Sequence, residues 1–145
     1  MDNKLSESNI VKLYKFLFAF EKEYANCYGK FNLSDGRIIS FKEKENILLG
    51  SMCKTNEKKI NGAKYFILWD DAKPDRFKSM PNNDSAYNLL KHLRNSIAHG
   101  NIISENRQKF SLNDYNRANN LSMKGKISNK LFFQLLELII STKSN

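Results

Sequence analysis

Apolar side chains recur at helical spacing near the beginning of the chain. The pattern predicts a helix that begins at Ser8, with Ser6 or Ser8 as its N-cap, and ends near Gly29. Its periodic apolar positions are Ile10, Leu13, Tyr14, Leu17 and Phe20. Because Phe16 and Phe18 widen the apolar surface, we expect this helix to be buried on two sides or to carry a dimer contact.

Two further helices are predicted in the second half of the chain. One begins at Asn83, Asp84 or Ser85 and ends at Gly100, a residue that commonly terminates helices. The other begins after Ser128 and is strongly apolar. Its buried positions are expected to be Leu131, Leu135, Leu138 and Ile139.

The remaining segments have weaker patterns. Residues 38–52 fit a helix or a short strand, and residues 54–69, which end in AKYFILW, are predicted to be helical. Residues 70–83 hold both prolines and are predicted to be a loop. The polar segment 101–126 is expected to contain one or two short strands. With 145 residues, 2 Pro and 6 Gly, the chain predicts one domain, 1–145, built mainly from helices.

The net charge of +9 indicates a polyanionic partner, nucleic acid first, although the abundance of Lys accounts for part of it. The two cysteines, Cys27 and Cys53, form no CxxC pair or Cys/His cluster and are expected to be reduced. No stretch approaches the roughly 18 apolar residues of a membrane span, and the N-terminus is unlike a secretory signal. These features predict a cytoplasmic protein without a membrane partner.

Side chains of the predicted helix 83–100 sort into two stripes at about 100° per residue. The core stripe holds Ala86, Leu90, Leu93 and Ile97. The opposite stripe holds Asn88, His92, Asn95 and His99, which includes both histidines of the protein, and Lys91 and Arg94 flank it. Imidazoles transfer protons near neutral pH. Amides and cations donate hydrogen bonds to phosphate. Two histidines on one exposed face also occur by chance, and that alternative stays open.

The spacing Arg94-Asn95-x-x-x-His99, within LRNSIAHG, resembles the signature of the HEPN superfamily. That signature is an Arg, a polar residue, a short spacer and a His near the end of a helix. The resemblance implies an all-α helical bundle, with a short β-hairpin placed here between the motif helix and the C-terminal helix. It also implies a homodimer in which two motifs meet in a cleft. Many members are metal-independent endoribonucleases of toxin–antitoxin and anti-phage systems, whereas others only bind.

The three motif residues suit RNA cleavage by the adjacent 2′-hydroxyl. His99 is expected to transfer a proton, Arg94 to face the phosphate, and Asn95 to orient the imidazole or bind a phosphate oxygen. One motif offers a single His, so two copies in a dimer would supply an acid and a base together. Lys91, His92 and Ser96 are predicted substrate contacts, and for His92 the roles of second proton carrier and of plain surface residue remain open.

The sequence therefore predicts a bacterial endoribonuclease whose partners are RNA, a second copy of the chain and an antitoxin or regulatory protein. No metal site or cofactor is expected, because the chain has only two histidines, no HExxH and no phosphate-binding Gly-rich loop. The first alternative is an inactive HEPN module that binds nucleic acid or a partner protein. The second is a helical interaction protein with an incidental motif.

Overall fold

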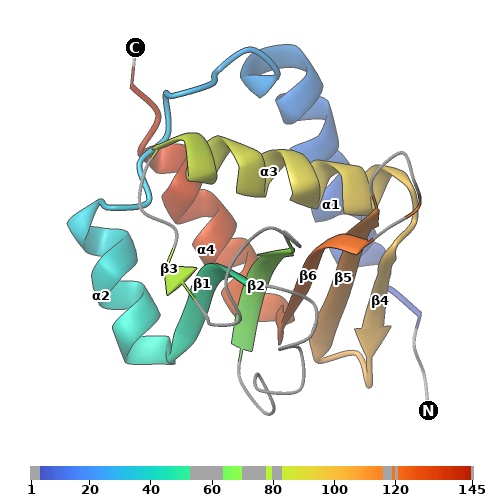
Figure 1. The fold of residues 1–145 in the computed structure, drawn as a ribbon. Helices are drawn as coiled ribbons and strands as arrows, with labels where there is room; N and C mark the ends of the chain where they lie inside the picture. Colours follow the sequence, from blue (N-terminus) through green and yellow to red (C-terminus); the bar gives the residue numbers. More distant parts are fainter. Residues whose placement is uncertain are drawn as a thin grey trace.

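In the computed structural model, a six-stranded sheet lies against the helices (Figure 1). The structure describes residues 4–52, 64–69, 78–79, 83–115, 119 and 121–144. The elements are α1 (Glu7–Ala19), the π-helix η1 (Phe20–Tyr24), α2 (Gly36–Glu45), β1 (Ile47–Met52), β2 (Lys64–Trp69), β3 (Lys78–Ser79), α3 (Asn83–Ala98), β4 (Ile102–Glu105), β5 (Lys109–Tyr115), β6 (Leu121–Ser128) and α4 (Asn129–Ser141). The strand order is β3-β1-β2-β6-β5-β4. Strands β1 and β2 are parallel, and every other pair is antiparallel.

The sheet makes the fold mixed α/β, so the predicted all-α bundle is wrong. Strands β4, β5 and β6 form a three-stranded antiparallel unit where only a short hairpin was expected. The physical reason is a two-residue period: in β6 the buried positions are Met123, Gly125 and Ile127, and the residues between them are partly exposed. Such alternation is typical of a strand with one buried face.

The segment 54–69 shows a second error of the same kind. Residues 64–69 form β2 rather than the end of a helix, because a short apolar run fits a buried strand as well as a buried helix. Residues 53–63, which include Cys53, lie outside the described part of the chain. Within the predicted loop 70–83, Lys78–Ser79 form β3. Residues 70–77 and 80–82 lie outside the described part of the chain.

The ambiguous segment 38–52 contains parts of a helix and a strand. Helix α2 begins after Asp35, whose carboxylate accepts a hydrogen bond from the backbone N–H of Arg37. The side-chain hydrogen bond from Arg37 also lowers the pKa of Asp35. Asn46, with a φ of 59°, ends the helix in the left-handed conformation, and β1 follows directly.

The helices predicted from Ser8, from residues 83–85 and after Ser128 are confirmed. Ser6 and Ser128 cap α1 and α4 by accepting hydrogen bonds from backbone N–H groups. Gly100, with a φ of 71°, follows the end of α3. Helix α1 ends earlier than predicted and continues as the π-helix η1. No helix in the described ranges has both the length and the hydrophobicity needed to cross a membrane.

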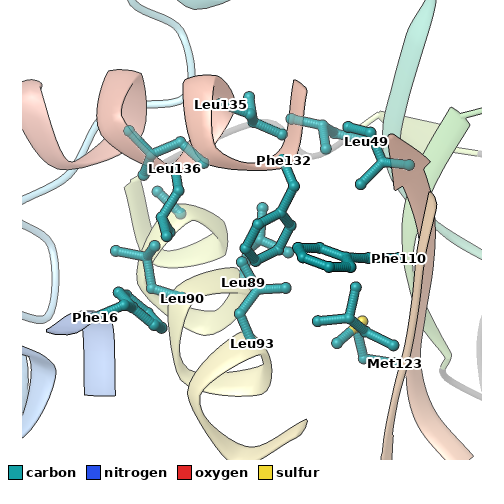
Figure 2. Packing of buried hydrophobic residues seen from close by; sticks show 14 of the residues in the cluster. Phe16, Leu49, Leu89, Leu90, Leu93, Phe110, Met123, Phe132, Leu135 and Leu136 are labelled. Carbon is teal, nitrogen blue, oxygen red and sulfur yellow. The ribbon is translucent and has the colours of Figure 1, made fainter. Parts of the chain in front are cut away.

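Helices α3 and α4 pack against the sheet, and α1 packs against α3 (Figure 1). Figure 2 shows Phe132 of α4, Leu89 of α3 and Phe110 of β5 meeting in the core, where all three are almost fully buried. The rings of Phe132 and Phe110 meet edge to face with centroids 5.3 Å apart. This packing fixes the position of α3 over β5.

Helix α1 is buried on one side only. Leu13 and Phe16 belong to the core, whereas Val11, Tyr14 and Phe18 are 52%, 65% and 70% exposed. Of the two expectations for this helix, burial on two sides is therefore wrong within the described part of the chain. The exposed apolar side leaves the dimer contact as a prediction.

We expect Phe132→Ala to lower the free energy of unfolding by about 3–5 kcal/mol, because it leaves a cavity between α3, α4 and β5. Ile39→Ala on α2, at a position 40% exposed, is the control and should change it by less than about 0.5 kcal/mol. Urea denaturation followed by circular dichroism measures both. Equal losses in the two variants would contradict this assignment of the core.

Candidate active site

The polar side of α3 faces the end of β5. Phe110, Leu112 and Asp114 occupy the three buried positions of that strand, so Asp114 points from the sheet toward the helix. Its residue surface is only 2% exposed. A carboxylate stands here where an apolar residue would continue the pattern, and a buried carboxylate requires hydrogen-bond donors around it.

Asp114 receives those donors from α3 and from its own strand. Its Oδ2 lies 2.7 Å from Nδ1 of His92 and 3.4 Å from Nδ2 of Asn95, and its Oδ1 accepts from the backbone N–H of Tyr115 at 3.0 Å. An ionised carboxylate only accepts hydrogen bonds, so Nδ1 of His92 carries the hydrogen. In the neutral ring, Nε2 then has a free lone pair.

Arg94 joins the same cluster through Asn95. Its Nη1 donates to Oδ1 of Asn95 at 3.0 Å, while its Nε and Nη2 lie 2.6 and 2.5 Å from Oε1 of Glu21. Glu21 belongs to the π-helix η1, and such helical bulges frequently occur at functional sites. Glu21, Arg94, Asn95, Asp114 and His92 thus form one continuous chain of polar contacts.

His99 lies at the surface just after α3. Its backbone N–H donates to the carbonyl of Asn95 at 3.0 Å, so helical geometry extends through His99. Its side chain is exposed and contacts no partner among the described residues. The imidazole is therefore open to a ligand that reaches Arg94 and Asn95.

The predicted substrate contacts have three different environments. Lys91 is exposed on α3. His92 is 25% exposed in its side chain and is bound to Asp114. Ser96 is fully buried, and its hydroxyl donates to the carbonyl of His92 at 2.9 Å. The hydroxyl of Ser96 therefore supports the helix, and this geometry offers it no route to RNA.

Asp114 and Glu21 were not predicted from the sequence. The available signal for Asp114 was its place in KFSLNDY, where it continues the alternation of Phe110 and Leu112. Glu21 had no such signal, because its partner Arg94 is distant in the sequence. In the described ranges, no group of three or more His, Cys, Asp or Glu side chains is arranged to hold a metal ion.

A comparison with protein families gives a match over most of the chain. The family model described as HEPN pEK499 p136 matches residues 8–145, which is nearly the whole chain. No curated protein and no solved structure matches the chain.

The contact between Glu21 and Arg94 predicts that Glu21→Gln tightens binding of a single-stranded, all-2′-deoxy oligonucleotide about two- to fivefold. The carboxylate competes with phosphate for the guanidinium, and its removal frees that cation. Fluorescence anisotropy measures the affinity. Glu137→Gln on α4, an exposed position, removes the same charge elsewhere and should have a smaller effect. Equal tightening in both variants would contradict a specific competition at Arg94.

Proposed function

Because the chain belongs to the HEPN pEK499 p136 family, we propose that it is a metal-independent endoribonuclease that cuts RNA at Arg94, Asn95 and His99. The HEPN superfamily includes many ribonucleases, often from toxin and defence systems. The observation that carries the proposal is the pair of Arg94 and Asn95, in contact at 3.0 Å, one helical turn before the open imidazole of His99.

In the proposed reaction, the 2′-hydroxyl loses its proton to a base and its oxygen attacks the adjacent phosphorus. The bond from phosphorus to the 5′-oxygen breaks, and that oxygen takes a proton from an acid. The products are a 2′,3′-cyclic phosphate and a 5′-hydroxyl, and no co-reactant is consumed. The chemistry requires two proton-transfer groups and a stabilising charge.

The motif residues fit these requirements. Arg94 presents a fixed fork of donors to the phosphate oxygens, where negative charge develops. RNA must first displace Glu21 from that fork, and the 55% exposure of the Glu21 side chain leaves it room to move. His99 transfers a proton. Asn95 holds the guanidinium of Arg94, because the Oδ1 of Asn95 accepts a hydrogen bond from it. Lys91 adds a positive charge beside the phosphate backbone.

A homodimer is part of this proposal. HEPN ribonucleases typically act as dimers on RNA, with two motifs in one cleft. The exposed apolar side of α1 supports pairing, because Val11, Tyr14 and Phe18 are poorly suited to contact water. That helix leads directly into η1, where Glu21 contacts Arg94, so the apolar side and the site belong to consecutive elements of the chain.

We place the protein in the cytoplasm of a bacterium, as the RNA-cutting effector of a toxin–antitoxin or anti-phage system. Uncontrolled cleavage of cellular RNA would damage the host, so this role requires an antitoxin or another regulatory partner. The net charge of +9 supports RNA as the ligand.

The test is incubation of end-labelled RNA with the purified protein in EDTA, followed by analysis of the product ends. We expect cleavage that leaves 2′,3′-cyclic phosphate. Arg94→Ala and His99→Ala should each reduce the rate about a hundredfold or more, because each removes a transition-state contact. Lys130→Ala, at an exposed position at the start of α4, removes a charge away from the site and should retain the rate.

Absence of cleavage across several RNAs, by a folded and dimeric protein, would contradict the proposal. Retained RNA affinity in that case would favour the inactive binding module. Cleavage that persists in His99→Ala would contradict the assignment of the site.

A further inference from the structure

The side of α3 that carries Arg94 also carries an aromatic ring and a second cation. At about 100° per residue, Tyr87, Lys91 and Arg94 fall within about 60° of one another around the helix. Lys91 is exposed, and the other two residues are partly exposed. This side of α3 faces η1 (Figure 1), since Glu21 contacts Arg94. Phe20 of η1 stacks on Tyr87 with ring centroids 6.1 Å apart.

Tyr28, in the loop after η1, extends this aromatic surface into solvent. It is 58% exposed, and its ring meets the ring of Tyr87 at 82° with centroids 5.5 Å apart. Such a perpendicular contact covers at most one face of the Tyr28 ring. Exposed aromatic rings beside cations are typical of proteins that bind single-stranded nucleic acid, because bases stack on the rings and the cations contact phosphates.

The position of the Tyr28 ring is fixed by the residues around it. In the turn before it, the backbone N–H of Cys27 donates to the carbonyl of Tyr24 at 3.0 Å. The hydroxyl of Tyr87, whose ring contacts Tyr28, donates to the carbonyl of Ala25. Because these contacts exist before a ligand binds, a base that stacks on Tyr28 loses little affinity to the ordering of this loop.

The separation between Tyr28 and Arg94 suits a short stretch of RNA. Tyr87, which contacts Tyr28, lies seven residues before Arg94, and this corresponds to about 10.5 Å along the axis of α3 and about 20° around it. Stacked nucleotides advance about 3.4 Å each along a strand, and unstacked nucleotides advance further. A base on Tyr28 would therefore lie about three nucleotides or fewer from a phosphate on Arg94. The exposed Lys91 lies between the two on the helix.

We propose that Tyr28 forms a stacking subsite for a nucleobase of single-stranded RNA, a few nucleotides from the phosphate that Arg94 binds. This inference rests on the proposed ribonuclease function and names a substrate-binding residue for the same site. Lys91 contacts the phosphate backbone between the two groups. The ring recognises the π-face that every base has, so the subsite favours single strands without selecting a sequence. It adds to the composite site of the dimer and replaces none of its groups.

Fluorescence anisotropy at one fixed salt concentration tests the stacking contact with two probes. One is a short, single-stranded, all-2′-deoxy oligonucleotide, and the other is the same sugar-phosphate backbone without bases. We expect Tyr28→Leu, which keeps the apolar bulk but has no π-face, to weaken binding of the first probe about fivefold or more. Its binding of the second probe should change less than about twofold. Tyr28→Phe retains the ring and should bind both probes as the unmutated protein does.

Tyr115→Leu is the matched control, because Tyr115 is 43% exposed at the end of β5, and it should leave both affinities within about twofold. Unchanged binding of the first probe by Tyr28→Leu would overturn the inference. Equal weakening for both probes would also overturn it, because the loss would not depend on a base. Light scattering compares the oligomeric states, and a dimer lost in Tyr28→Leu would instead assign the ring to a contact between two copies of the chain.

Steady-state cleavage of RNA in EDTA separates this inference from the ribonuclease function. We expect Tyr28→Leu to raise KM about fivefold or more with kcat within about twofold, because a base bound away from the reacting phosphate contributes equally to the ground and transition states. If the unmutated protein cuts no RNA but its preference for the probe with bases still depends on Tyr28, only the ribonuclease function fails. If the unmutated protein cuts RNA and Tyr28→Leu has a normal KM, only the subsite fails.

Discussion

The hydrogen bonds to the buried carboxylate of Asp114 are the interactions on which the candidate site depends. This carboxylate stands on the core-facing side of β5 and accepts hydrogen bonds from His92 and Asn95 of α3. Burying a carboxylate without partners is strongly unfavourable, so the strand and the helix are held in one register by the need to satisfy it. Asn95 also accepts a hydrogen bond from Arg94, and Arg94 donates to Glu21, so these two side chains are connected to the same cluster.

The apolar core supplies the rigid support that this polar cluster needs. Phe110 and Leu112 precede Asp114 on the same face of β5, and Phe132 of α4 covers Phe110 (Figure 2). Because α3 packs on this surface through its core stripe, its polar side chains cannot rotate away from β5 without disturbing the core. The site is thus held by two regular elements rather than by a loop, which favours fixed distances between reacting groups.

The sequence predicted the helices and the motif better than it predicted the sheet. Helical periodicity and the Ser6, Ser128 and Gly100 signals identified α1, α3 and α4, and the resemblance at residues 94–99 agrees with the family match. Strand β2 was predicted as a helix because it is a short apolar run. The extent of the sheet at β4, β5 and β6 was underestimated because β6 interleaves Lys and Ser with its buried residues. Asp114 and Glu21 meet α3 only through tertiary contacts, which no local pattern reveals.

The most direct measurement is a crystal structure of the protein with a short RNA whose reactive 2′-hydroxyl is replaced by hydrogen. The account predicts a phosphate on the guanidinium of Arg94, in place of Glu21, with the ring of His99 toward one of its ester oxygens. His92 should still bind Asp114 in that complex. An RNA phosphate bound elsewhere, with Glu21 still on Arg94 and His99 turned away from the nucleotide, would contradict it.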